Sequence, residues 1–210
     1  MEGMKKLMAF DLEGTLTDMI SWEMLHRKFG TCEKAKKHAE LFFSGKISYE
    51  EWARLDASLW VGRRKEEVEE TFKDVKLKPG AQELASWLKG NGFKIAIISG
   101  GLMCLAKKIA NILNVDHVYA NELVFKDGKV TGDVIVRVTF DNKGEILNEL
   151  KRALRPKVTV AVGDWKNDVP MFKVADVSIS LGHDHADYNA RDLYEVKRIL
   201  EELFQGTEKL

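Results

Sequence analysis

Two carboxylic acids, Asp11 and Glu13, stand directly after the apolar run Leu7–Phe10. The apolar run is typical of a strand buried on both faces, so polar groups at its end lie at the edge of a sheet. Two acids this close can divide a displacement reaction between them, with one carboxylate attacking and the other transferring protons. Taken singly, the two acids are more simply the end of a strand and a turn, so covalent chemistry on a carboxylate is predicted only together with further groups at the same edge.

Three later segments supply groups of complementary chemistry. Each follows a buried-strand pattern or begins a predicted helix: Ser99 with Gly100 and Gly101, then Lys143, then Asp164 and Asp168. Neighbouring carboxylates raise each other's pKa unless a cation joins them, and an oxygen-only ligand set favours Mg²⁺. The lysine and the serine can hold anionic oxygens, and the glycines let main-chain N–H groups approach them. This pattern predicts a phosphoryl group held between a magnesium ion and a lysine.

A parallel sheet would bring these residues together. Apolar residues at helical spacing predict helices over 81–92, 102–113 and 143–154. Alternation of such helices with strands favours a doubly wound parallel-sheet (Rossmann-like) α/β core, in which ligands bind beyond the carboxyl ends of the strands. The runs with the continuous apolar character of buried strands are Leu7–Phe10, Ile95–Ile98, Val158–Val162 and Val177–Leu181.

Two segments interrupt this alternation. Residues 19–76 contain no strand pattern but several helical ones, and they predict a helical cap domain inserted after the first strand. The α/β catalytic core would then consist of residues 1–18 and 77–210. Strand patterns on either side of Asp127 and Gly128 predict a β-hairpin.

The composition narrows the classes of partner. The 210 residues carry 33 basic and 33 acidic side chains, so the formal net charge of +0 argues against nucleic-acid and anionic-membrane partners. The first residues have neither a signal-peptide pattern nor an apolar stretch able to span a bilayer. Cys32 and Cys104 are too few for a disulfide framework, which favours reduced thiols and a cytoplasmic location. We expect a small phosphorylated metabolite as partner, and a monomer or a homodimer.

Four segments resemble, in order, the four motifs of the haloacid dehalogenase superfamily: DLEGTLTD, IISGG, NKGE and GDWKND. Each motif alone is weak, but four in order are strong. The segments VFKDGKVTGDV and KGEILNEL, with a helical insert after the first motif, are similar to the phosphoserine phosphatase branch, and the resemblance extends over residues 6–203. It implies a Mg²⁺-dependent phosphatase, a phosphoric monoester hydrolase that forms an aspartyl-phosphate intermediate on a small phosphate monoester.

The resemblance also implies a role for each site residue. Asp11 is then the nucleophile, and Glu13 is the general acid that protonates the leaving oxygen and afterwards the base that activates water. Mg²⁺ is held by Asp11, by the main-chain carbonyl of Glu13 and by Asp164. Asp168 acts through a metal-bound water and through Lys143. The residues assigned to the substrate are Ser99, Gly100, Lys143 and Asn167.

Three positions depart from the family pattern. Glu13 stands where most phosphatases of the superfamily carry Asp, so its reach differs by one methylene. Ile20 replaces the Glu that holds the ammonium group of phosphoserine, and Asp56 replaces the Arg that grips its carboxylate. Arg54 lies two residues from Asp56 and would face another direction on a helix. An aspartate at this position would repel the substrate carboxylate.

Aromatic residues of the insert bear on the same selectivity. We expect most of them in the core of the cap, with Phe43, Trp52 and Trp22 offering apolar surface to a substrate. The expected enzyme is phosphoserine phosphatase-like but not selective for phosphoserine. It should hydrolyse an aryl phosphate such as p-nitrophenyl phosphate more efficiently than phosphoserine.

Several alternatives stay open. The same aspartyl-phosphate would serve a phosphotransferase with an alcohol acceptor, and a different alignment of the insert would give a true phosphoserine phosphatase. A non-enzymatic receiver-like module also has an acidic Mg²⁺ pocket, but it would be shorter and would lack the helical insert. His183 and His185 could mark a transition-metal site, although their spacing favours a solvated loop.

Overall fold

The computed structural model of the protein describes residues 6–182 and 185–205. Seven strands in this part of the chain form one sheet in the order β4-β3-β2-β1-β5-β6-β7. Neighbouring strands are parallel except for the antiparallel pair β3 and β4. The strands are β1 (Lys6–Phe10), β2 (Phe93–Leu102), β3 (His117–Lys126), β4 (Lys129–Ile135), β5 (Val158–Gly163), β6 (Val177–Leu181) and β7 (Tyr188–Ala190).

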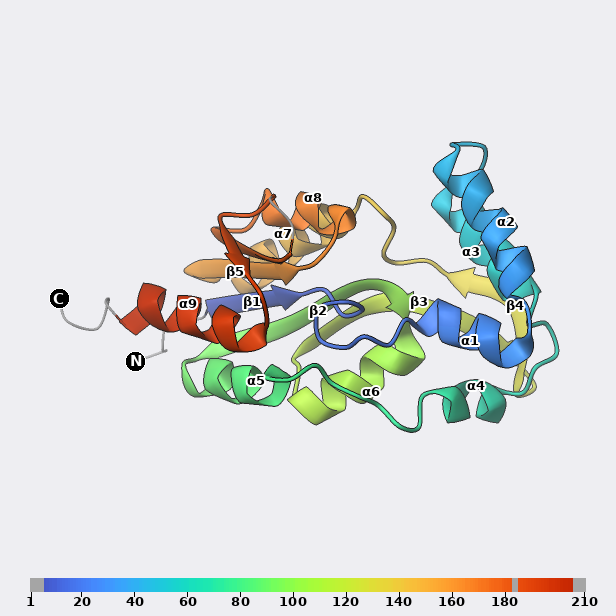
Figure 1. The fold of residues 1–210 in the computed structure, drawn as a ribbon, viewed down its shortest axis with the longest axis horizontal. Coiled ribbons are helices and arrows are strands. Elements are labelled where there is room, and N and C mark those ends of the chain that lie inside the picture. Colours follow the sequence, from blue (N-terminus) through green and yellow to red (C-terminus); the bar gives the residue numbers. More distant parts are fainter. Residues whose placement is uncertain (1–5, 183–184, 206–210) are drawn as a thin grey trace.

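Helices cover both faces of the sheet (Figure 1). One face packs against α5 (Ala81–Gly90), α6 (Met103–Leu113) and α9 (Leu193–Gln205), and the other against α7 (Lys143–Leu154) and α8 (Val169–Phe172). Alternate residues of β1 enter two separate cores, since Met8 and Phe10 lie in one apolar cluster and Leu7 and Ala9 in the other. The predicted doubly wound core is confirmed. The sequence indicated it because a strand that is buried on both faces must be apolar throughout.

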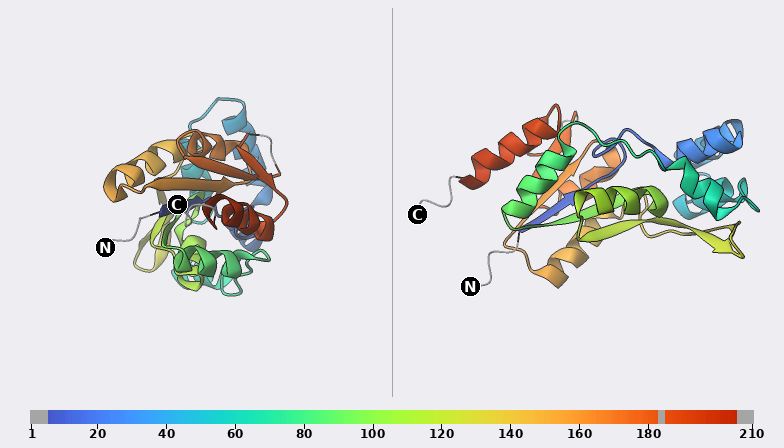
Figure 2. Two further views of the ribbon diagram at one scale, coloured as in Figure 1. Left: turned by 90° about the vertical axis from the view of Figure 1, so that its left-hand side faces the viewer. Right: turned by 90° about the horizontal axis from the view of Figure 1, so that it is seen from below.

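Of the five helices between β1 and β2 in the chain, four gather beyond one end of the sheet (Figures 1 and 2). They are α1 (Ser21–Phe29), α2 (Cys32–Phe43), α3 (Tyr49–Ser58) and α4 (Lys65–Thr71). The first three match the helical sequence patterns over 22–29, 33–43 and 49–59, whereas α4 is too short to give one. The division into a core and a cap over residues 19–76 stays a prediction.

A β-hairpin joins β3 and β4, as predicted. Its two-residue turn consists of Asp127 and Gly128, which have φ of 51° and 73°, and positive φ at both positions matches the twist of the flanking strands. The hairpin reaches the helical insert, because Gly62 N donates to Val130 O at 2.9 Å and Lys65 N donates to Gly128 O at 2.8 Å. Main-chain hydrogen bonds therefore connect the insert to the sheet.

The strand β2 differs from its prediction. The sequence places its end at Ile98, before Ser99 and two glycines, but the strand continues to Leu102 with a shift of register against β3 after Ile98. Glycines in a strand often mark such an irregularity, where another group approaches the backbone.

No helix in residues 6–182 and 185–205 combines the length and apolar character needed to cross a membrane. Both cysteines, Cys32 at the start of α2 and Cys104 in α6, are free thiols.

Candidate active site

The ends of β1, β2 and β5 bring the predicted site residues to one edge of the sheet. Phe10 is in register with Ile97 of β2 and with Val162 of β5. Asp11 and Asp164 directly follow the ends of β1 and β5, and Ser99 lies two residues after Ile97 within β2, so the three residues stand at neighbouring positions on adjacent strands. Carboxyl ends of adjacent parallel strands are where ligands bind in an open α/β sheet.

Lys143 connects two of the acids. This first residue of α7 is fully buried, and its Nζ donates to Asp11 Oδ1 at 2.7 Å and to Asp168 Oδ1 at 2.6 Å. Burial disfavours the charged ammonium, but the two carboxylates outweigh it and raise the pKa of Lys143 above its ordinary value. The lysine is therefore a permanent cation at the centre of the site.

Asp168 is held entirely by the protein. Its second oxygen, Oδ2, accepts from Asp164 N at 2.9 Å and from Trp165 N at 3.0 Å. Because Oδ1 already accepts from Lys143, both oxygens of this buried carboxylate have partners. Asp168 thus fixes the loop that carries Asp164 and orients the lysine, whereas its predicted role through a metal-bound water stays a prediction.

Three carboxylates form an acidic cluster. Oxygen atoms of Asp11, Asp164 and Asp168 all lie within 4.8 Å of one another. Thr15 Oγ1 donates to Asp164 Oδ1 at 2.7 Å and so orients that side chain. Burial raises the pKa of Asp11 well above its ordinary value; Lys143 lowers it, and the other two acids raise it further. An all-oxygen cluster with more negative than positive charge fits a hard divalent cation such as Mg²⁺.

Glu13 lies between the start of α1 and the irregular end of β2. Its Oε1 accepts from Ser21 N at 2.9 Å and from Ser21 Oγ at 2.5 Å. On the other side the carboxyl group rests against Gly101, where a Cβ would overlap Oε1 and Cδ. The missing side chain of Gly101 makes room for a glutamate. Burial raises the pKa of Glu13, and the hydrogen bonds from Ser21 lower it only in part.

The segment Ser99–Gly101 is held by bonds that the sequence did not predict. Gly101 N, which we had expected to face phosphoryl oxygens, donates to the buried hydroxyl of Ser99 at 3.0 Å. The carbonyl of Gly100 accepts from Trp22 Nε1 at 3.1 Å, from Tyr49 Oη at 3.1 Å and from Asn121 Nδ2 at 3.0 Å. Two helices of the insert and strand β3 therefore converge on one carbonyl group.

Asn167 shows a different feature. Its Oδ1 is buried and has no hydrogen-bond partner among the described residues, although it lies next to Asp168. A buried acceptor without a donor is costly, and a ligand that brings a donor would satisfy it.

The structure corrects the interpretation of Asp56. This residue is 5% exposed and lies inside the insert, with Oδ1 at 2.7 Å from His38 Nδ1 and Oδ2 at 3.3 Å from His26 Nε2. It pairs with histidines and does not face a substrate. Arg54 and Ile20 are both exposed. His183 lies outside the described residues, and His185 is exposed.

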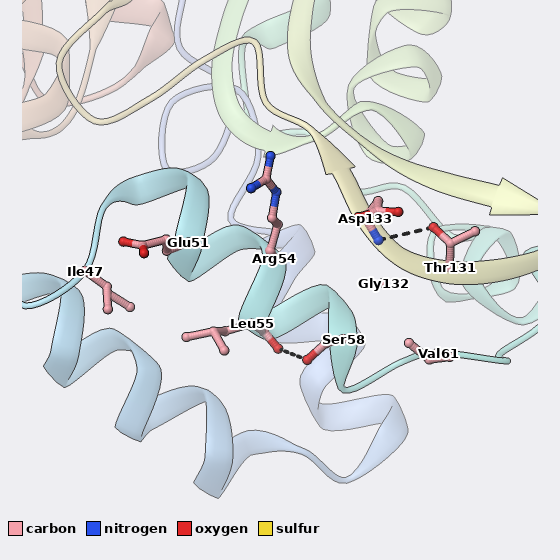
Figure 3. A pocket seen from close by; sticks show the side chains of 9 residues that line it. All are labelled: Ile47, Glu51, Arg54, Leu55, Ser58, Val61, Thr131, Gly132 and Asp133. Atoms are coloured by element: carbon pink, nitrogen blue, oxygen red, sulfur yellow. Dashed lines mark hydrogen bonds between the residues drawn. The ribbon is translucent and has the colours of Figure 1, made fainter.

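A groove of about 460 Å³ lies between α3 and β4 (Figure 3), and its lining residues do not include Asp11, Asp164 or Asp168. Arg54 and Leu55 leave α3 on different sides of the helix (Figure 3). The groove is lined by Ile47, Glu51, Arg54, Leu55, Ser58, Val61, Thr131, Gly132 and Asp133.

The chain is similar to known proteins in both sequence and structure. A family model described as haloacid dehalogenase-like hydrolase matches residues 5–176. A phosphoserine phosphatase of Methanocaldococcus jannaschii is 36% identical over 208 residues, which cover 98% of this chain and 99% of that protein. A phosphoserine phosphatase of Lactococcus lactis subsp. lactis is 30% identical over 211 residues, which cover 98% of this chain and 97% of that protein. A solved substrate-bound phosphoserine phosphatase complex has a TM-score of 0.81 at 34% identity, covering 94% and 99%.

Proposed function

Because the chain belongs to the haloacid dehalogenase-like hydrolase family and is a phosphoric monoester hydrolase, we propose that it cleaves a small phosphate monoester through an aspartyl-phosphate on Asp11. The observation that carries this proposal is the buried Lys143 between Asp11 and Asp168, beside Asp164 in an all-oxygen cluster. Asp11, Asp164 and the main-chain carbonyl of Glu13 would hold Mg²⁺. When bound, the ion would neutralise charge on the phosphoryl oxygens.

The reaction has two steps. An oxygen of Asp11 forms a bond to phosphorus while the bond from phosphorus to the leaving oxygen breaks, and Glu13 gives its proton to that oxygen. Water then attacks phosphorus, Glu13 takes a proton from it, and the bond to Asp11 breaks to release phosphate. Lys143 stays charged throughout, so it can stabilise the phosphoryl oxygens, and its charge lowers the pKa of Asp11 against the effect of burial.

The substrate is a second part of the proposal. An aromatic ring of α2 meets rings beside the site, since the centroids of Phe42 and Phe140 are 6.0 Å apart and those of Phe140 and Trp165 are 6.1 Å apart. Phe140 precedes Lys143 by three residues, and Trp165 follows Asp164. An apolar leaving group would pack on this surface, so we propose that the enzyme is not selective for phosphoserine.

A true phosphoserine phosphatase is the second candidate, because relatives of that name are 36% and 30% identical over nearly the whole chain. The test compares kcat/KM for p-nitrophenyl phosphate and for phosphoserine at saturating Mg²⁺. We expect the aryl ester to be the better substrate, and a clearly higher value for phosphoserine would establish the second candidate.

Asp11→Asn is the accompanying variant. It keeps the shape of the side chain but removes the nucleophile, so phosphate release from both esters should disappear. Normal turnover in this variant would refute the aspartyl-phosphate.

A further inference from the structure

Ser21 makes a set of hydrogen bonds that fixes the orientation of its hydroxyl group. The residue is fully buried at the start of α1, and its Oγ accepts from Leu102 N at 2.8 Å. A hydroxyl has a single proton, and that of Ser21 is directed to Glu13 Oε1 at 2.5 Å. The N–H of Ser21 also donates to Glu13 Oε1 at 2.9 Å.

We propose that Ser21 is a positioning residue that holds the Glu13 carboxyl group in the orientation needed for proton transfer. The inference rests on the proposed phosphatase function. Because Oε1 accepts from two donors, the proton of the neutral acid resides on Oε2. During the first step this proton moves from Oε2 to the leaving oxygen as the bond from phosphorus to that oxygen breaks. The negative charge left on Glu13 is then stabilised by both donors of Ser21.

This arrangement also connects the acid to two elements. Ser21 is the first residue of α1, and Leu102 is the last residue of β2. Gly101 forms the opposite wall of the Glu13 carboxyl group. The carboxyl group is therefore enclosed between the insert and the sheet. The Ser21 hydroxyl bonds both to this carboxyl group and to the main chain of β2 at Leu102.

The test uses the dependence of the rate on the leaving group. Because p-nitrophenolate leaves without a proton whereas an alkoxide needs one, a misplaced acid affects the alkyl ester more. In Ser21→Ala, kcat/KM for an alkyl phosphate such as phosphoserine should fall about a hundredfold or more. The value for p-nitrophenyl phosphate should fall much less. Ser21→Thr restores a hydroxyl and should recover the ratio of the two values.

Ser178→Ala is the matched control. Ser178 is 3% exposed in β6, and its hydroxyl donates to Asp187 Oδ2 at 2.7 Å, so its removal also deletes a buried serine–carboxylate bond. This control should leave the ratio unchanged. An unchanged ratio of the two kcat/KM values in Ser21→Ala, whether both values fall equally or neither falls, would overturn the proposal.

A second measurement does not depend on turnover. In Glu13→Ala, the amide proton of Ser21 loses its acceptor, and its exchange with solvent should become faster. If the exchange rate stays the same, the contact does not exist and the proposal fails. Wild-type protein that releases no phosphate from either ester would instead refute the phosphatase function itself, which separates the two failures.

Discussion

At the scale of single residues, the site depends on Gly101, whose lack of a side chain leaves room for Glu13. The carboxyl group of Glu13 occupies the volume in which a Cβ at position 101 would stand. Gly101→Ala should therefore displace Glu13 from Ser21 and lower kcat by about a hundredfold or more, the usual contribution of a positioned acid–base group. Steady-state kinetics with p-nitrophenyl phosphate and phosphoserine measure the loss.

Two further variants make this prediction specific. Glu13→Asp shortens the side chain, so Gly101→Ala should cost less in that background than in the wild type. Gly90→Ala is the control, since Gly90 ends α5 and a Cβ there meets nothing within 4 Å. Additive effects of the two changes at positions 13 and 101 would mean that Gly101 has another role.

The sequence predicts the acids and the lysine of the site because each follows an apolar run or begins a helix. It does not predict the residues that hold them. Ser21 and Leu102 are 81 residues apart in the chain, and no periodic pattern connects them. Asn121 is only weakly marked in the sequence as a residue with a special role, since asparagine is uncommon in strands. Its amide bonds to Gly100 and Tyr49 can be found only when the elements are placed in space.

At the scale of elements, the carbonyl of Gly100 joins the helical insert to the sheet. Tyr49 of α3 and Trp22 of α1 both donate to it. Tyr49→Phe removes one donor, and a typical hydrogen bond contributes about 1 kcal/mol to stability. Amide protons of α1 and α3 should therefore exchange faster in this variant, while those of β1 and β5 should not. Hydrogen exchange followed by mass spectrometry resolves these segments.

Tyr194→Phe is the control for this element. Tyr194 lies on α9, distant in the chain from the insert, and is 51% exposed. Faster exchange throughout the protein in Tyr49→Phe would contradict a local effect, because it would indicate global destabilisation.

The predicted end of β2 was wrong because local signals and tertiary contacts conflict there. The glycines after Ser99 normally end a strand, yet β2 continues through them because Leu102 N bonds to Ser21 and the Gly100 carbonyl receives three donors. The turn at Asp127 and Gly128 was predictable, because positive φ at both positions suits these residue types.

At the scale of the whole molecule, the acidic cluster should link stability to the metal. A cation that binds only the folded state at a hundred times its Kd adds about 2.7 kcal/mol, or roughly 5–10 °C in Tm for a chain of this size. Mg²⁺ added to protein freed of metal by a chelator should produce this shift in scanning calorimetry. Asp164→Asn should abolish most of it, whereas Asp133→Asn, at an exposed position of β4, should not.

The hairpin β3–β4 has a consequence for exchanging parts between relatives. Main-chain hydrogen bonds join residues 62–65 of the insert to residues 128–130 of the hairpin, and they place Arg64 opposite Lys129 in an antiparallel β-bridge. A chimaera that received only the segment between β1 and β2 would therefore keep a foreign hairpin against its new helices. The transferable module comprises two stretches that are distant in the gene, the insert and the hairpin, and recombination that moves both together should yield folded hybrids more often than a single crossover pair.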